Sequence, residues 1–305
     1  GKKLTLRLSH SMVSGDTALD VFATKLKELA EAKTGGALEI QLFANNVLGQ
    51  EREVVQQVQQ GLVDMMMSGT AIWGAVAPKL QIIDLPFLWR DYDHVNKVMD
   101  GEVGQAFTQY MAETAKARPM GFCDSFGFRN VVTRSKEVKT AEDLRGLKLR
   151  TIQSPIYVKA IELMEANPTP MAFGEVYTSM QTGVLDGYEH DASTSLATKF
   201  YEVAKYLART QHIHGTVINA VSVQKIDALP ADLKKALEDA AREAALYQRG
   251  RAPSEDEKAL AELKAKGMTI NDFDRKPLIP KAEPFWVSYA REVGAEDLIQ
   301  KIIAA

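Results

Sequence analysis

The stretch that decides the fold reads LRGLKLRTIQSP and spans residues 144–155. Within it, Leu147, Leu149 and Thr151 alternate with Lys148 and Arg150, which is the period-two pattern of a β-strand. Ser154 can then cap a helix, and Pro155 suits the first helical position. Arg150 therefore lies near the carboxyl end of a predicted strand, where open α/β sheets bind ligands. Because the planar fork of arginine fits a carboxylate with two parallel hydrogen bonds, Arg150 is a candidate carboxylate clamp.

The segments on either side of this stretch repeat one order of strands and helices. Before it, predicted strands at 4–8, 38–42 and 62–67 alternate with helices that end at Gly35 and Gly61. After it, helices at 155–166 and 174–182 precede a further strand. Such an alternation predicts parallel sheets covered by helices. The sequence QQGLVD at 59–64 also aligns with QTGVLD at 181–186, which indicates a repeated lobe.

Two extended stretches, near 120–128 and 211–220, are long enough to cross between lobes. A long helix that Pro230 opens contains Pro253, which is expected to kink it. We therefore predict a two-lobed α/β fold in which each lobe is a mainly parallel sheet flanked by helices. The predicted N-terminal lobe comprises 1–124 and 213–251, and the C-terminal lobe comprises 125–212 and 252–305.

The composition favours a protein that binds small solutes. The 305 residues carry a net charge of −3, so nothing indicates a nucleic-acid or anionic-membrane partner. No apolar run reaches the roughly 18 to 20 residues that span a bilayer. Two localisations fit, a cytosolic protein or a mature exported chain whose signal has been removed.

The sequence contains no recognised catalytic or cofactor motif of the hydrolase, phosphate-loop, dinucleotide or zinc-protease kind. The single cysteine, Cys123, excludes an intrachain disulfide and is expected to be a buried structural thiol. His212 and His214 share one face of a predicted strand, but no further ligand lies at metal-binding spacing. Ordinary hydrogen bonding is therefore expected for both, with no metal and no cofactor.

A second arginine, Arg129, ends the first crossing stretch, so both arginines can face one cleft. Polar Gln153 and His190 and aromatic Phe173 lie near them and complete a plausible anion site. Further candidates for ligand binding come from loops at strand ends, and for each of them a purely structural role is the alternative. They are His10, Asn46, Glu51, Ser68, Trp73 and Asp191, together with Tyr188 and Glu189.

Several segments carry a resemblance to a known family. They are LRGLKLR at 144–150, NPTPMAFGEVY at 167–177, MQTGVLDG at 180–187, LGQE at 48–51 and ADL at 231–233. Together they make the whole chain similar to the periplasmic solute-binding subunit of TRAP transporters, of the DctP type.

The resemblance implies a periplasmic-binding-protein-like fold that closes over an organic acid in the cleft between its lobes. It implies that Arg150 pairs with the carboxylate, that Arg129 assists, and that Phe173 packs on the ligand. The family often has asparagine where Gln153 and His190 stand, which leaves the ligand open. It also implies a periplasmic protein that hands its ligand to the TRAP membrane subunits, and we expect a monomer.

The polar candidates suit a hydroxylated acid, so we predict a sugar acid such as a uronate or an aldonate. A C4 dicarboxylate or a 2-oxo acid stays open, because two arginines can serve two carboxylates. The rival class is a cytosolic two-domain enzyme that acts on a carboxylate, with His190 as general base beside Asp191 or Glu189. A ligand-sensing partner of a signalling receptor would use the same binding chemistry.

Overall fold

The computed structural model describes residues 2–305, which form two compact units. Unit 1 comprises the chain up to Leu80 with Asn96–Ser125 and Thr216–Ala252, and unit 2 comprises Gln81–Val95, Phe126–Gly215 and Pro253–Ala305. The lobe boundaries expected from the sequence stay a prediction. The units differ from them chiefly at residues 81–95, which pack with unit 2, where the Trp286 indole N–H donates to the carbonyl of Pro86 at 2.7 Å.

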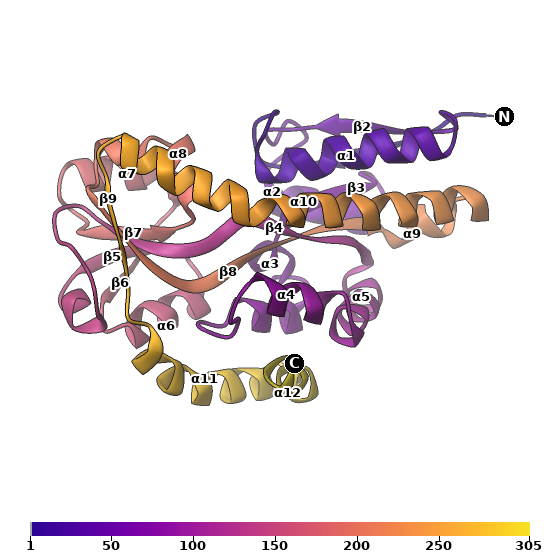
Figure 1. Cartoon of the computed structure of the whole chain (residues 1–305). Helices are drawn as coiled ribbons and strands as arrows, with labels where there is room; N and C mark the ends of the chain where they lie inside the picture. Colours follow the sequence, from indigo (N-terminus) through magenta and orange to yellow (C-terminus); the bar gives the residue numbers. More distant parts are fainter. Residues whose placement is uncertain (1) are drawn as a thin grey trace. The chain divides into compact units, whose positions relative to one another are not determined.

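Unit 1 is built on a mainly parallel sheet. Its strands are β1 (Leu4–Ser9), β2 (Leu38–Phe43), β3 (Met65–Gly69) and the second part of β8 (Tyr206–Ser222), and its helices are α1 (Ala18–Lys33), α2 (Glu51–Gln59), α3 (Thr70–Trp73), α5 (Glu102–Ala115) and α9 (Val223–Asp227). Their order is β2-β1-β3-β8, where β1 runs parallel to β2 and β3, and β8 is antiparallel to β3. Helix α1 lies beside β2 (Figure 1). Leu6 and Leu8 of β1 are buried, as the alternating pattern predicts.

Unit 2 repeats this arrangement. Its strands are β5 (Lys148–Thr151), β6 (Asn167–Pro170), β7 (Gly187–His190), β9 (Thr269–Asp272) and parts of β4 and β8, and its helical segments are η2 (Ala141–Leu144), α6 (Pro155–Leu163), η3 (Phe173–Glu175), α7 (Val176–Gln181), α8 (Ala192–Ala197), η4 (Phe200–Glu202), η5 (Lys276–Leu278), α11 (Ile279–Glu292) and α12 (Glu296–Ala304). Strand β5 runs parallel to β6 and β7, β7 is antiparallel to β4, and β9 is parallel to β8. The C-terminus ends α12 (Figure 1).

Five elements have residues in both units, and two of them, β4 and β8, contain the extended stretches that were predicted to cross between lobes. The five elements are η1 (Pro78–Asp84), α4 (Tyr92–Met99), β4 (Ala117–Thr133), β8 (Tyr206–Ser222) and α10 (Ala231–Ala265). Helix α10 continues through Pro253, so the proline does not end it. Within residues 2–305, no helix is both long enough and apolar enough to cross a membrane.

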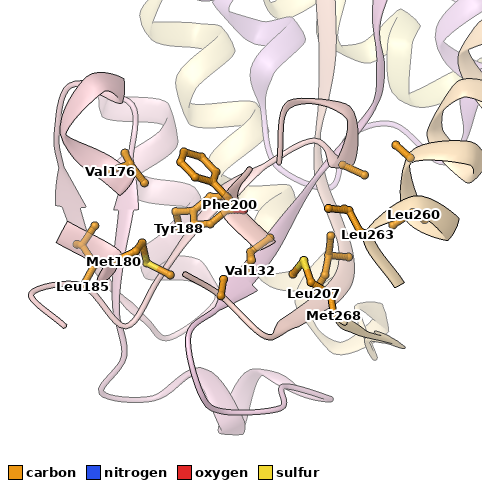
Figure 2. Close-up of a cluster of buried hydrophobic side chains, with 13 residues drawn as sticks. Val132, Val176, Met180, Leu185, Tyr188, Phe200, Leu207, Leu260, Leu263 and Met268 are labelled. Carbon is orange, nitrogen blue, oxygen red and sulfur yellow. The ribbon is translucent and has the colours of Figure 1, made fainter. Parts of the chain in front are cut away.

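The core of unit 2 joins its sheet to the end of the long helix. Figure 2 shows Tyr188 of β7 and Val132 of β4 in one cluster with Leu260 and Leu263 of α10. Helix α7 contributes Met180. Each of these side chains is at least nine-tenths buried, so the cluster holds β4, β7 and α10 together through the hydrophobic effect.

The aligned sequences at 59–64 and 181–186 form the same local structure. Gly61 and Gly183 have positive φ of 76° and 80°, and the following apolar residues, Leu62 and Val184, are 60% and 59% exposed. The motif then ends in Asp64 and Asp186. Each accepts a backbone N–H from the neighbouring parallel strand, from Arg7 of β1 at 2.7 Å and from Lys148 of β5 at 2.8 Å.

This equivalence relates β1, β2, β3 and β8 of unit 1 to β5, β6, β7 and β4 of unit 2. In unit 1, Ser9 of β1 lies opposite Met66 of β3, whereas in unit 2 Arg150 of β5 lies opposite Tyr188 of β7. Unit 1 therefore has a serine at the position where unit 2 has its strand-end arginine.

Candidate functional site

Arg150 lies on β5, between β6 and β7, one residue before that strand ends. It is 3% exposed, and its Nε donates to the carbonyl of Met171 at 2.9 Å. Among residues 2–305 neither Nη atom of Arg150 has a hydrogen-bond or ion-pair partner. The fork that would hold a carboxylate is thus left unoccupied by the protein.

The charge of Arg150 is only partly compensated. Burial lowers its pKa to about 10, Glu189 opposes this, and the like charge of Arg129 adds to it. The guanidinium still carries its proton at neutral pH. A buried cation in a setting of low dielectric interacts with an incoming anion more strongly than an exposed cation does.

Phe173 covers one side of this arginine. The guanidinium carbon of Arg150 lies 5.6 Å from the centre of the Phe173 ring, a cation–π distance. The same ring meets His190 edge-on at 5.5 Å. Phe173 is nonetheless 39% exposed, so part of its face can receive the apolar face of a ligand, and Arg150, Phe173 and His190 form one group.

His190 ends β7, and two contacts decide its protonation. Its Nδ1 lies 2.9 Å from the backbone N–H of Asp191 and 3.1 Å from Asp191 Oδ2. A neutral ring accepts the N–H and carries its proton on Nε2, whereas a protonated ring donates to the carboxylate. Burial lowers the pKa of His190, Arg129 lowers it further, and Asp191 opposes both. At neutral pH the ring is therefore uncharged.

We predict that His190 titrates below pH 6.5, with Nε2 protonated in the neutral ring. NMR of the side-chain nitrogens of the five histidines measures the titration midpoint and the tautomer, and His190→Asn identifies the signals of His190. Asp191→Asn should move the midpoint further down, because it removes the charge that favours imidazolium while an asparagine still caps α8. A midpoint at or above 6.5 in the wild-type protein would contradict the assignment.

Arg129, on β4, is held by a buried network. Its Nε donates to Glu189 Oε1 at 2.8 Å, and its Nη2 lies 2.5 Å from Oε2. His212 Nε2 lies 2.9 Å from the same Oε1, and its Nδ1 lies 2.8 Å from the hydroxyl of Thr210. Because the ionised Glu189 carboxylate can only accept, Nε2 carries a hydrogen and donates it, and in the neutral ring Nδ1 accepts from the Thr210 hydroxyl, whose oxygen also accepts the N–H of Val131.

The network keeps Glu189 ionised although the residue is fully buried. Burial would raise its pKa, but the charge of Arg129 and hydrogen bonds from Arg129 and His212 lower it to about 2. The positive charge of Arg129 is consequently matched by one negative charge inside the protein. Arg150 is the guanidinium of the predicted pair that lacks such a partner.

Tyr157 also belongs to this group, although it was not among the residues predicted from the sequence. Tyr157 lies in the first turn of α6 and is 5% exposed. The Arg129 guanidinium carbon stands 5.0 Å from the centre of its ring. An aromatic residue in the first turn of the helix that follows β5 was the available signal.

The other predicted residues of unit 2 follow Arg150 and His190 closely in the sequence. Gln153 is exposed in the loop between β5 and α6. Asp191 is buried and caps α8, where Oδ1 accepts the N–H of Thr194 at 2.7 Å. The structure thus assigns Asp191 a helix-capping contact in addition to its contact with His190.

The predicted residues of unit 1 fall into two kinds. His10 and Trp73 are buried, and their ring nitrogens are engaged: His10 contacts Asp20 and the N–H of Met12, and Trp73 donates to the carbonyl of Ile218. Asn46, in a turn with positive φ, and Glu51 are half-buried. Buried Ser68 donates to Glu51 Oε2.

His212, His214 and Cys123 all lie in the interior of the protein. His212 and His214 are both buried, and His212 uses its two ring nitrogens in the network around Glu189. Cys123 is a buried free cysteine, and burial raises the pKa of its thiol. Across residues 2–305 no group of three or more histidine, cysteine or acidic side chains could hold a metal ion.

Comparison with known proteins shows which family the chain belongs to. The model for the bacterial extracellular solute-binding protein family 7 (DctP) matches residues 8–292. The 2,3-diketo-L-gulonate-binding periplasmic protein YiaO of Escherichia coli is 34% identical over 89% of this chain and 82% of its own.

Solved structures of similar fold support the same family assignment. A TRAP periplasmic solute-binding protein of Polaromonas sp. JS666 bound to D-erythronate has a TM-score of 0.88 at 30% identity and covers 99% of both chains. One from Citrobacter koseri with bound D-glucuronate has a TM-score of 0.85 at 31% identity and covers 98% of both. The two-lobed fold expected from the resemblance is confirmed, and the chain belongs to the DctP family of bacterial extracellular solute-binding proteins.

Proposed function

We propose that this chain captures a sugar acid with one carboxylate, such as a uronate or an aldonate, for a TRAP membrane transporter. The observation that carries the proposal is Arg150, a buried cation whose two Nη atoms have no partner among residues 2–305. The ligand carboxylate takes both Nη atoms, its carbon skeleton packs on Phe173, and His190 Nε2–H donates to a neighbouring ligand oxygen.

Charge matching supports one carboxylate over two. Arg129 and Glu189 neutralise each other, which leaves Arg150 as the unmatched cation of the group. A second buried carboxylate would have no positive partner there, and an unpaired buried charge is costly. A C4 dicarboxylate is therefore disfavoured.

The relatives support the hydroxylated part of the ligand. A diketogulonate, an erythronate and a glucuronate are each a carboxylate that carries oxygen-bearing carbons. In unit 1, Asn46, Glu51 and Ser68 follow or end parallel strands and offer donors and acceptors of the kind that hydroxyl groups need. We propose that these residues contact ligand hydroxyls, with Gln153 as a further contact, whereas the ring nitrogens of His10 and Trp73 already have partners within the protein.

A thermal-shift screen with D-glucuronate, D-erythronate, succinate and pyruvate tests the proposal. At a hundredfold excess over Kd, a ligand stabilises by about 2.7 kcal/mol, which raises Tm by several degrees. We expect this for a sugar acid, with the ligand recovered chemically unchanged by mass spectrometry. A shift with succinate alone contradicts the single carboxylate, and conversion of the ligand would support the enzyme alternative.

We further propose that the protein acts in the periplasm as a monomer and delivers its ligand to the TRAP membrane subunits without catalysis. Family membership supports the compartment and the partner. Sedimentation with and without D-glucuronate measures the oligomeric state, and a single species of about the monomer mass, 33.7 kDa, is expected.

A further inference from the structure

A second buried ionisable group lies away from Arg150, on the long helix. Asp256 of α10 is 4% exposed, and its Oδ2 accepts a hydrogen bond from the hydroxyl of Tyr92 at 3.1 Å. Its Oδ1 is buried and has no hydrogen-bond partner among residues 2–305. A neutral carboxyl tolerates an unpaired buried oxygen far better than a carboxylate does, since the carboxylate must lose its hydration. The observed packing therefore suits the protonated form.

The same carboxyl packs on the backbone of β4. A side chain at Gly127 would place its Cβ 2.8 Å from Asp256 Oδ1, so the carboxyl fills the space that a side chain at 127 would take. Gly127 has a φ of +141°, and Phe126 before it has a φ of +68°. Two successive residues with positive φ bend the strand where Asp256 meets it, and only glycine fits at 127.

This contact lies where the chain enters unit 2. The boundaries between the units fall at 95/96, 125/126, 215/216 and 252/253. Tyr92, Gly127, His214 and Asp256 each lie within a few residues of one boundary, on the side of unit 2. The Tyr92 ring packs edge-on against Phe128 at 5.2 Å and against His214 at 6.3 Å, so the four segments share one cluster.

We propose that Asp256 is a proton-operated latch between α10 and β4, packed on Gly127 when neutral and released when it loses its proton. Burial raises the pKa of Asp256 to about 7, and the negative charge of Asp191 also raises it. The hydrogen bond from the Tyr92 hydroxyl and the positive charge of Arg209 act in the opposite direction and lower the pKa. The ionisable groups around Asp256 are Tyr92 on α4, Asp191 at the start of α8, Arg209 and His214 on β8, and Glu257 on α10. Arg209 forms an ion pair with Glu257 at 2.9 Å, so the charge of Arg209 is compensated by that carboxylate.

NMR of protein labelled with ¹³C at the aspartate carboxyl groups tests the latch without any ligand. One signal should titrate near pH 7 and be absent from Asp256→Asn. Tyr92→Phe should move this midpoint upward, because it removes the donor that favours the carboxylate. A carboxyl signal of Asp256 that titrates below pH 5 overturns the proposal, and this measurement needs only the wild-type fold with an assignment variant.

Hydrogen exchange of the β4 amides at 126–130 tests the release itself. With a midpoint near 7, the ionised fraction rises about tenfold between pH 6 and pH 8, so protection corrected for intrinsic exchange should fall about tenfold. Asp256→Asn, which resembles the neutral acid, should remain protected, and the exposed-site control Glu262→Gln should behave as wild type. Equal pH dependence in wild type and Asp256→Asn overturns the latch.

Discussion

Replacing Glu189 with glutamine is expected to lower the free energy of unfolding by about 3 kcal/mol at pH 7. The substitution keeps the size of the side chain but leaves the buried Arg129 guanidinium without its charge partner. It also replaces the acceptor of His212. Chemical denaturation at constant ionic strength measures the loss.

The pH dependence identifies the cause. Because the pKa of Glu189 is lowered to about 2, its contribution is present above its ordinary pKa of 4.5 and is lost as the pH falls towards 2. The difference between wild type and Glu189→Gln should therefore be largest above pH 5 and should shrink on acidification. Glu162→Gln, an exposed change on α6, is the control and should change little. A difference that stays constant with pH would contradict the charge pairing.

Replacing Arg150 with lysine is expected to weaken the binding of D-glucuronate, or of the sugar acid that binds best, by about ten- to hundredfold. Lysine keeps the positive charge but lacks the two parallel donors, and one hydrogen bond to a charged group is worth about 1.5–3 kcal/mol. Isothermal titration calorimetry measures the change. The free energy of unfolding should be little affected, because within residues 2–305 Arg150 donates one hydrogen bond, to the carbonyl of Met171.

Arg145→Lys is the matched control for this substitution. Arg145 lies in the same sequence segment, but it is exposed and pairs with Glu165 at 3.2 Å. Its replacement should leave affinity within about twofold of wild type, since exposed ion pairs contribute little. Equal affinity of Arg150→Lys and wild type would remove Arg150 from the site, whereas equal losses in both variants would indicate a general effect on folding.

Local patterns predicted the strands and helices that carry the site. The alternation at 147–151 and the Ser-Pro pair after it specify a strand, a turn and a helix from neighbouring residues alone, and β5 and α6 form as predicted. The repeated motif at 59–64 and 181–186 could also be recognised from the sequence, because its glycine occupies a turn position with positive φ, which is a local requirement of the backbone.

Side-chain partners were much harder to predict. The sequence pattern treats Trp73 as a residue of a strand-end loop, whereas the structure buries it completely and bonds its indole to Ile218. The two residues are 145 positions apart. Periodicity reports which residues face inward, but it contains no information about which distant group an inward-facing N–H will meet.

The sequence by itself determined the family, the order of strands and helices, and the position of Arg150 at a strand end. Only the tertiary structure decided how the two arginines differ. Arg129 and Glu189 lie 60 residues apart, and the antiparallel pairing of β4 with β7 brings their charges together. Arg150, one strand away, keeps its Nη atoms unpaired within the described chain. Charge compensation depends on such long-range contacts, because a buried charge is governed by its neighbours in space.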